Sequence, residues 1–556
     1  MRAGDCNAAS PGERAAPPPR GARLRPVILA PLSRGTILLA ISAVGLATVL
    51  GGAVGRRTDE VPRAALTEYA QLVSTAESWN AGKVSAEKLV YASIHGMLSS
   101  LDPHTSFLEP DDFSSLEERH HGSYFGIGIS MQRRQGRVTV MSVTQGTPAW
   151  KIGLRTGDVI TAIDGEIVDD AWDTRRVSDH VRGAKGTSVR LTIHRPGLGE
   201  PITVTVTRDE IPQNSVRHAF LLGDGVGYIQ LAEFTQTSAD ETSRAIRNLE
   251  REGMKRLLFD LRGNPGGVLD PALAIADIFL KKGQVIVTTR GRIPSADRDY
   301  AAAGGARRFD GPLVVLINRG SASASEIVAG AVQDHDRGLI LGTTSWGKGL
   351  VQGVYPVSYG AGLALTTAKY FTPSGRWIQR DYSDLSAYLL PDVHDDSAPD
   401  TARKTGKLFS TDAGRPVYAA GGITPDEIVP APKPSRFARR LQAHGVFFNF
   451  AVDYLARHPD VPRSFSLDAA VRDELFRFIE SQGIEKADAA RAAYLSDETR
   501  NRIDSEIVQD VLSAKFGPDE GWKSWLRSDV QVERALGAFP EAERLASLKP
   551  HSLSRS

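Results

Sequence analysis

Three serines alternate with alanines immediately after a short hydrophobic run, and their setting suits nucleophilic chemistry. The run LVVLIN predicts a strand, and the segment 320–326, GSASASE, leads into a helix that we expect to begin at about Ser323. A strand that delivers small residues to a helix start exposes a hydroxyl group beside unpaired backbone N–H groups, which can stabilise an oxyanion. Because Ser323-x-x-Glu326 is also a capping-box pattern, a purely structural role for this serine stays open.

A serine nucleophile needs a base, and Lys348 is the candidate best placed to lose its proton. Gly347 and Gly349 flank it and allow close backbone packing, while Trp346 and Leu350 can exclude water. Burial lowers the pKa of a lysine, and a fall from about 10.4 to about 7 lies within the range that desolvation supplies. We therefore expect a neutral amine at position 348.

Other side chains could assist this lysine or replace it. Gln352, four positions further on, could orient the amine through a hydrogen bond, or it could simply be a polar residue of an edge strand. His104 and His335 are the alternative bases. The residues alone leave these alternatives open.

Two further glycine-rich segments resemble known motifs but lack an essential residue. The segment 342–348, GTTSWGK, fits the first seven positions of a phosphate-binding P-loop, but Gly349 replaces the Ser or Thr that would hold magnesium. A strand is also predicted after it, where a P-loop needs a helix. The segment 263–267, GNPGG, imitates the loop around a chymotrypsin-type nucleophile, but Pro265 occupies the place of the serine. Nucleotide binding and a His-Asp-Ser mechanism are therefore disfavoured.

Composition narrows the function classes further. The chain has 67 basic and 66 acidic residues, so its net charge of +1 gives no indication of a nucleic-acid partner. Its one cysteine, Cys6, lies in a leader rich in Pro, Arg and Ala, which leaves the rest without a thiol nucleophile or a Cys-based zinc cluster. We expect no metal ion and no organic cofactor.

The elements that must position these residues follow from the hydrophobic pattern. From about residue 209 to 430, strands and helices alternate, which predicts an α/β core. Short β-branched runs separated by turns predict a β-rich module at 122–208. The polar, turn-rich stretch 381–420 predicts a surface insertion in the core.

Helical patterns flank these regions on both sides. Residues 60–121 show helical spacing, and residues 431–556 show it again. In the second region Leu467, Val471 and Leu475 recur every four residues behind the expected cap Ser466, and Gly483 should end that helix.

The N-terminus reads as a targeting segment. A basic leader at 1–34 precedes an almost purely apolar stretch at 35–55, which is long enough to cross a bilayer. The arginines before it keep the leader cytoplasmic by the positive-inside rule. We therefore expect a single-pass protein of the inner (cytoplasmic) membrane whose catalytic part is extracytoplasmic, in the periplasm. Cleavage of the segment as a signal peptide stays open.

Several runs together resemble the carboxyl-terminal processing peptidases, or tail-specific proteases. They are GSASASEIVAGAVQD, LGTTSWGKGLVQ, LALTTAKYFTPSGRWIQ, DLRGNPGG and GITPD, and the resemblance covers roughly residues 61–430. It implies a multidomain α/β fold, with a ClpP/crotonase-like protease core, an inserted PDZ domain and helical regions at both ends. It also implies a Ser–Lys dyad of Ser323 and Lys348, assisted by Gln352. The implied oxyanion donors are the N–H of Ala324 and one from the glycine loop, at Gly266 or Gly267.

The β-rich module is similar to a PDZ domain, on the segments 147–149, 153–160 and 163–165. Such domains add a peptide as an extra strand and hold its terminal carboxylate on backbone N–H groups. The matching loop runs from Tyr124 to Ile129, and the residues expected to bind the peptide C-terminus are Phe125, Gly126, Ile127 and Gly128; the plain alternative is a tight β-turn. The resemblance also implies that peptide binding there gates the dyad, so a resting, inactive arrangement is an expectation.

The prediction is a serine endopeptidase that engages protein or peptide substrates by their free C-termini. One rival is a non-catalytic scaffold that recruits partners through the PDZ module and the helical ends. A second rival is a PDZ-linked chymotrypsin-type protease. A homo-oligomer formed through the terminal helices and an activating partner protein are further hypotheses.

Overall fold

The computed structural model describes residues 63–305, 308–385, 388, 407–419 and 421–549, and these fall into two units that meet between Val90 and Tyr91. The described part of the first unit contains helix α2 (Arg63–Trp79) and the start of α3 (Ala86–Ser99). Apolar side chains of α2 such as Leu66 and Leu72 are exposed. Everything below concerns the second unit.

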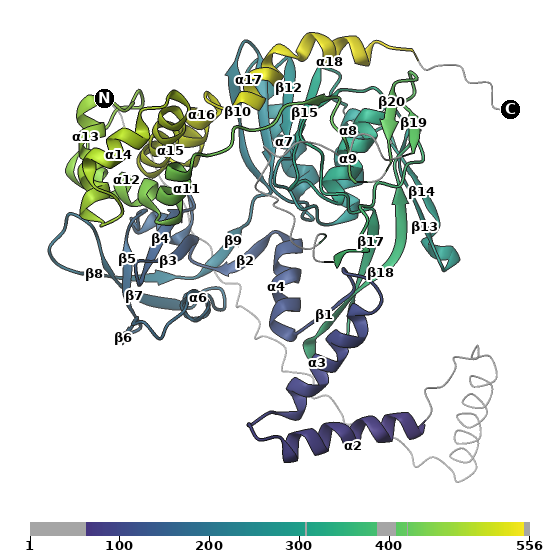
Figure 1. Cartoon of the computed structure of the whole chain (residues 1–556), viewed down its shortest axis with the longest axis horizontal. Coiled ribbons are helices and arrows are strands. Elements are labelled where there is room, and N and C mark those ends of the chain that lie inside the picture. Colours follow the sequence, from purple (N-terminus) through teal and green to yellow (C-terminus); the bar gives the residue numbers. More distant parts are fainter. Residues whose placement is uncertain (1–62, 306–307, 386–387, 389–406, 420, 550–556) are drawn as a thin grey trace, which may run out of the picture. The chain divides into compact units, whose positions relative to one another are not determined.

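A six-stranded sheet forms the centre of the second unit (Figure 1). Its first two strands are antiparallel, and every later neighbour pair is parallel. All five residues of β15 are buried, as expected for a strand covered on both faces. The strands, in spatial order, are β10 (Val216–Gly223), β11 (Val226–Leu231), β12 (Arg256–Asp260), β15 (Leu313–Ile317), β16 (Leu339–Gly342) and β21 (Glu427–Ile428).

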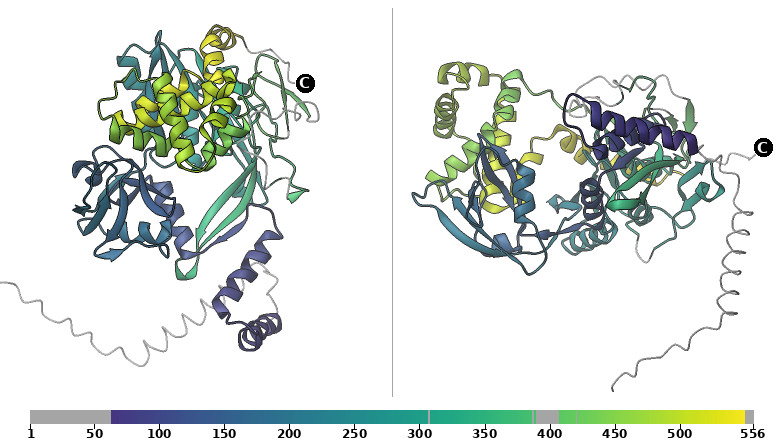
Figure 2. Two further views of the ribbon diagram at one scale, coloured as in Figure 1. Left: turned by 60° about the vertical axis from the view of Figure 1, so that its left-hand side comes forward. Right: turned by 90° about the horizontal axis from the view of Figure 1, so that it is seen from below.

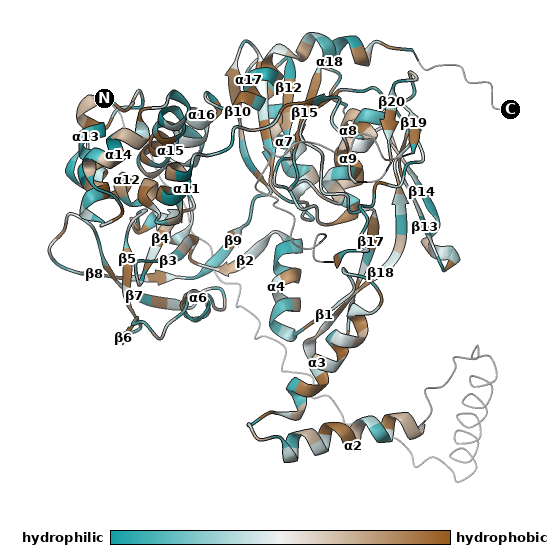
Figure 3. Cartoon of the chain, viewed as in Figure 1, coloured by the Kyte–Doolittle hydropathy of each residue, from teal (hydrophilic) through white to brown (hydrophobic). Residues whose placement is uncertain are grey.

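Helices cover both faces of this sheet. Because side chains alternate along a strand, Leu313, Val315 and Ile317 pack with one set of helices, and Val314 and Leu316 pack with the other. The central strand β15 is hydrophobic throughout, and its neighbour β12 is hydrophobic between Arg256 and Asp260 (Figure 3). The first set is α7 (Ser238–Arg251), α8 (Leu269–Phe279) and α9 (Ala324–Asp334), and the second is α16 (Pro518–Leu526), α17 (Val530–Gly537) and α18 (Phe539–Ala546).

The second unit contains another sheet, of five strands. Its central strand is β18, which pairs with β1 and β13 and with the preceding strand β17. The left view of Figure 2 shows β17 and β18 as a long two-stranded ribbon. The strands are β1 (Ser106–Leu108), β13 (Val285–Gly291), β14 (Arg298–Ala301), β17 (Leu350–Pro356) and β18 (Gly362–Phe371). Helix α4 (Pro110–His121) follows β1. Late in the predicted insertion, β19 (Leu408–Ser410) and β20 (Pro416–Tyr418) form a hairpin.

The β-rich module has a core of its own. Two strands, β2 (Ser123–Gly126) and β9 (Asp209–Pro212), pair where the chain enters and leaves it. Its sheet consists of β3 (Ile129–Arg134), β4 (Arg137–Val143), β5 (Val159–Ile163), β6 (Glu166–Ile167), β7 (Ser188–His194) and β8 (Ile202–Thr207), with α5 (Pro148–Lys151) and α6 (Thr174–Val181).

Five helices after the core share a separate hydrophobic cluster. The predicted cap Ser466 is corrected: α13 begins at Ala469, and the side chain of Asp468 accepts from the N–H of Val471. Leu467 is buried just outside the helix. These helices are α11 (Arg436–Ala443), α12 (Val446–Arg457), α13 (Ala469–Ser481), α14 (Ala487–Tyr494) and α15 (Asp497–Phe516).

None of the helices in the described residues is long and apolar enough to cross a membrane. Even α15, with 20 residues, carries charged residues along its length. The predicted span at 35–55 and its basic leader lie outside the described residues. The prediction of a single-pass inner-membrane protein with a periplasmic catalytic part is therefore corrected, because the described chain offers no helix that supports it.

Candidate active site

Three loops meet at one edge of the central sheet because they follow three neighbouring parallel strands. The glycine loop follows β12, the serine loop follows β15, and the loop that contains Lys348 follows β16. The carboxyl ends of parallel strands lie at the same edge of a sheet, which is where α/β proteins place their sites. Topology thus brings together residues that are far apart in the sequence.

Ser323 stands directly before α9 with a strained backbone. Its φ of 54° and ψ of −112° lie outside the regions that non-glycine residues favour, a kind of strain that concentrates at functional sites. The neighbouring residues hold this turn: the N–H of Ala322 and the hydroxyl group of Ser325 donate to the carbonyl oxygen of Asn264, at 3.0 and 2.9 Å. The hydroxyl group of Ser323 is therefore presented by a fixed turn at a helix start.

The buried side chain of Glu326 joins the serine loop to the lysine loop. One of its carboxylate oxygens, Oε2, accepts from the N–H of Ser323 at 2.8 Å and from the N–H of Lys348 at 2.9 Å. The other, Oε1, accepts from the hydroxyl group of Ser345 at 2.5 Å and from the N–H of Gly347 at 2.7 Å. Burial raises the pKa of Glu326 to about 7, against the lowering effect of these hydrogen bonds. Glu326, the capping-box residue, thus also fixes the loop that contains Lys348.

Lys348 lies where the two flanking glycines allow other chain segments to approach. A Cβ atom on Gly347 would lie 2.9 Å from the backbone N of Gly422, and one on Gly349 would lie 2.9 Å from Nε1 of Trp377. Burial lowers the pKa of Lys348, while the charges of Glu326 and Asp102 raise it. The net result is a lowered pKa for Lys348, which is the direction that a general base needs.

Gln352, in β17, contacts the amine directly. Its Oε1 accepts a hydrogen bond from Nζ of Lys348, and its Nε2 donates to the carbonyl oxygen of His104 at 2.6 Å. The ring of His104 forms a hydrogen bond with the hydroxyl group of Tyr388. Burial lowers the pKa of His104 to about 4, and the charge of Lys348 acts in the same direction. The histidine is thus neutral at neutral pH and sits beside the lysine.

His335, the other alternative base, lies at the opposite end of α9 from Ser323. Its ring contacts Asp412 and the carbonyl oxygen of Val285, each at 2.7 Å. An eleven-residue helix is about 16 Å long, so this ring cannot reach the serine. The geometry removes His335 as a base.

The glycine loop lies against the serine turn. A Cβ atom on Gly266 would stand 2.8 Å from Cβ of Ser323 and 3.0 Å from the backbone N of Ala324. The N–H of Gly266 already donates to Oδ1 of Asn264 at 2.9 Å. In the part of the chain that the structure describes, the N–H groups of Ala324 and Gly267 have no acceptor. These two donors remain available to a ligand.

The hydroxyl group of Ser323 and the amine of Lys348 are not hydrogen-bonded to each other here. Across the described residues, no hydrogen bond joins Oγ of Ser323 to Nζ of Lys348, whose amine faces Gln352. The hydroxyl group of Tyr370 instead lies between the two backbones: the carbonyl oxygens of Ser323 and Lys348 are both within its hydrogen-bond distance, and its single proton is donated to one of them at a time. The loops are adjacent while the side chains are not yet paired.

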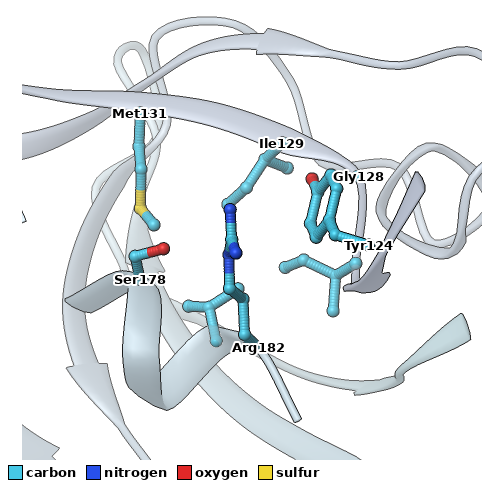
Figure 4. A pocket seen from close by; sticks show the side chains of 8 residues that line it. Tyr124, Gly128, Ile129, Met131, Ser178 and Arg182 are labelled. Atoms are coloured by element: carbon cyan, nitrogen blue, oxygen red, sulfur yellow. The ribbon is translucent and has the colours of Figure 1, made fainter. Parts of the chain in front are cut away.

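A pocket in the β-rich module lies between β3 and α6. Of the four predicted loop residues, Ile127 and Gly128 line it, whereas Phe125 and Gly126 belong to β2. Figure 4 shows Arg182 extending across this pocket, with Ser178 and Met131 on one side and Tyr124 on the other. The guanidinium group of Arg182 also lies over the ring of Tyr124 and bonds to Glu118 at 2.5 Å.

Sequence reasoning missed several residues of both sites. Tyr370 gave no signal because the backbone groups it contacts are distant in the chain, Asp102 gave none because its turn meets Gln352 only in the fold, and Glu326 was assigned a capping role alone. The pocket residue Arg182 was also missed, because the wide spacing in the chain between the predicted loop and the end of α6 hides their proximity; Tyr124, part of that predicted loop, does line the pocket. A basic residue at the end of a helix that borders a peptide groove is the signal that could have found Arg182.

Fold and site together define a serine hydrolase with a peptide-binding module. A model of the PDZ domain matches residues 126–207, and a model of peptidase family S41 matches residues 225–394. The carboxy-terminal-processing protease of Bartonella bacilliformis is 41% identical over 297 residues, which cover 53% of this chain and 68% of that protein. The chain therefore belongs to the carboxy-terminal processing proteases of peptidase family S41, and it is a serine-type endopeptidase.

A second relative agrees with this membership. The carboxy-terminal processing protease CtpA of Bacillus subtilis is 34% identical over 299 residues, 54% of this chain and 63% of that protein. A solved structure, the photosystem II D1 C-terminal processing protease, is 33% identical, covers 54% of this chain and 81% of its own, and has a TM-score of 0.31. The family models and the two relatives of 41% and 34% identity confirm the resemblance inferred from the motifs, and the scaffold and chymotrypsin-type readings are wrong.

Proposed function

We propose that this protein cleaves protein substrates with a Ser–Lys dyad of Ser323 and Lys348, assisted by Gln352. The observation that carries the proposal is the shared carboxylate oxygen of Glu326, which receives the backbone N–H groups of both dyad residues. That contact fixes the two loops within a few ångströms of each other. The lowered pKa of Lys348 and the strained backbone of Ser323 support the same roles.

The chemistry then follows in two stages. Neutral Lys348 takes the proton of Ser323 as the serine oxygen attacks the scissile carbonyl carbon, and it later gives that proton to the leaving amine. A water molecule, activated by the same amine, hydrolyses the acyl-enzyme. The developing oxyanion accepts from the free N–H groups of Ala324 and Gly267, so of the two glycines we favour Gly267.

Substrates engage through their free C-termini. The pocket between β3 and α6 offers a strand edge to which an extended peptide can add, as PDZ domains do. We propose that residues 122–208 form this module and that 209–430 form a ClpP/crotonase-like protease core, between helical regions at 60–121 and 431–556. The unpaired side chains of the dyad are consistent with a resting state that peptide binding converts to the active one.

Cleavage of one unstructured substrate with and without its last few residues tests the proposal. Ser323→Ala and Lys348→Ala should each lower kcat by at least about a thousandfold while circular dichroism stays unchanged. The exposed-site controls Ser295→Ala and Lys282→Ala should cleave like wild type. Removing the substrate's last residues should raise KM. Full activity in either dyad variant would refute the dyad.

A further inference from the structure

The turn at residues 102–105, directly before β1, contacts Gln352, the side chain that bonds to Lys348. Asp102 organises this turn: its Oδ1 accepts from the N–H groups of His104 and Thr105 at 2.8 and 2.9 Å, and its Oδ2 accepts from the hydroxyl group of Thr105 at 2.6 Å. The hydroxyl group of Thr366 in β18 adds a fourth contact, to Oδ1 at 3.1 Å. The carboxylate of Asp102 thus connects the turn to β18, the strand that pairs with β17.

The turn fixes the orientation of the Gln352 amide. A backbone carbonyl can only accept a hydrogen bond, so the carbonyl of His104, 2.6 Å from Nε2, holds the NH2 end of the amide on its own side. The oxygen end must then face Lys348, whose Nζ donates to it. An amide turned the other way would present a donor to the amine.

This orientation matters for a neutral amine. Such an amine has two N–H bonds and one lone pair, and only the lone pair can remove a proton. When one N–H is directed at Gln352, the amine's rotation is restricted and the lone pair can be aimed at the serine hydroxyl group. We propose that Asp102 is a positioning residue that aligns the base through His104 and Gln352, an inference that rests on the proposed role of Lys348.

The electrostatics add a measurable signature. Burial alone would raise the pKa of Asp102, but the hydrogen bonds from Thr105, His104 and Thr366 outweigh it and hold the pKa below its ordinary value. The carboxylate is therefore charged at neutral pH and raises the pKa of Lys348. The other titratable groups that face this amine are Glu326 on α9, whose charge also raises its pKa, and the ring of His104, whose own pKa the charge of Lys348 lowers. Loss of the Asp102 charge should lower the pKa of Lys348 further.

The test is the pH dependence of peptide cleavage by wild type, Asp102→Asn and Lys348→Ala. Asn keeps one acceptor oxygen but replaces the other with an NH2 donor, so the Thr105 hydroxyl group can no longer donate at that position and the turn loses the negative charge of the carboxylate. We expect kcat to fall about ten- to a hundredfold with KM unchanged, since small misalignments of catalytic groups have effects of that size. The acid limb of kcat/KM should move to lower pH.

Two controls make the outcome decisive. Asp112→Asn, an exposed acid on α4, should leave kcat and the pH profile unchanged. If Asp102→Asn does not fold, Thr105→Val removes the same contact and is judged by the same loss of kcat. An unchanged kcat, or a loss of kcat in Asp102→Asn without movement of the acid limb, would overturn the positioning role. Activity in Lys348→Ala would instead overturn the dyad on which this role depends.

Discussion

Glu326 shows how one buried carboxylate can organise a site without touching substrate. It accepts four hydrogen bonds from two loops, and its burial raises its pKa to about 7. The sequence predicted only its capping role, because the spacing to Ser323 is local while the contacts to Ser345, Gly347 and Lys348 arise from the fold. Residue types and local spacing therefore pointed to the chemistry, but the group that holds the two loops together is visible only in three dimensions.

Glu326→Gln should lower kcat strongly and change the pH dependence of stability. An amide has one acceptor oxygen, so two of the four donors lose their partner, at a cost of about 1–3 kcal/mol each. We expect kcat to fall at least tenfold. Because the folded-state pKa of Glu326 exceeds its unfolded value, its contribution to stability is present below about pH 4.5 and is lost as pH rises through about 7.

Urea unfolding between pH 5 and 8 measures this effect. The free energy of unfolding of wild type should decrease with pH relative to that of Glu326→Gln, by up to about 3 kcal/mol. The exposed Glu533→Gln on α17 should follow wild type. Parallel curves for wild type and Glu326→Gln would contradict the assignment.

Among the secondary-structure elements, the parallel order of the strands β12, β15 and β16 brings the three loops of the active site together. The alternation of strands and helices predicted an α/β core, and this coarse class is confirmed. The pattern could not say that β12, β15 and β16 are neighbours, because strand order depends on long-range packing. For that reason the proximity of the Gly266 loop to Ser323 was available only through the family resemblance.

Gly266→Ala tests how closely the glycine loop must approach the serine turn. The added Cβ would lie 2.8 Å from both the carbonyl oxygen of Ala322 and Cβ of Ser323, so one of the loops must move. We expect kcat to fall at least tenfold, with a loss of stability of about 1–3 kcal/mol.

Gly253→Ala provides the matched control for backbone strain. Gly253 has φ of 101°, against 100° for Gly266, but its Cβ would meet nothing within 4 Å. It should lose stability and keep its kcat. Equal losses of kcat in the two variants would show that strain rather than contact is responsible.

At the scale of the whole second unit, the C-terminal helices are attached to the core through a buried ionic network. Arg262, directly before the glycine loop, pairs with Asp260 and with Asp529 at 2.7 Å, and also bonds to Gln531. Asp260 accepts from the hydroxyl group of Tyr228. The helical character of the last 120 residues was predictable from spacing, but the role of α16, α17 and α18 as the cover of one sheet face was not.

Asp529→Asn should destabilise the protein by about 3 kcal/mol, because it leaves a buried arginine with one carboxylate fewer. Asn still caps α17, so the change isolates the ion pair. Arg534→Ala on the same helix breaks an exposed pair with Glu427 and should cost less than about 1 kcal/mol. Urea unfolding measures both; equal costs would mean that the buried pair does not anchor the helices.

The central claim is that Lys348 activates Ser323, and trapping of the acyl-enzyme tests it most directly. Wild type is mixed with an excess of a peptide ester at neutral pH, quenched in acid within milliseconds to seconds, and analysed by mass spectrometry. The account predicts an adduct on the peptide that contains Ser323 in wild type and none in Lys348→Ala or Ser323→Ala. An adduct of normal yield and rate in Lys348→Ala, or one on another residue in wild type, would contradict it.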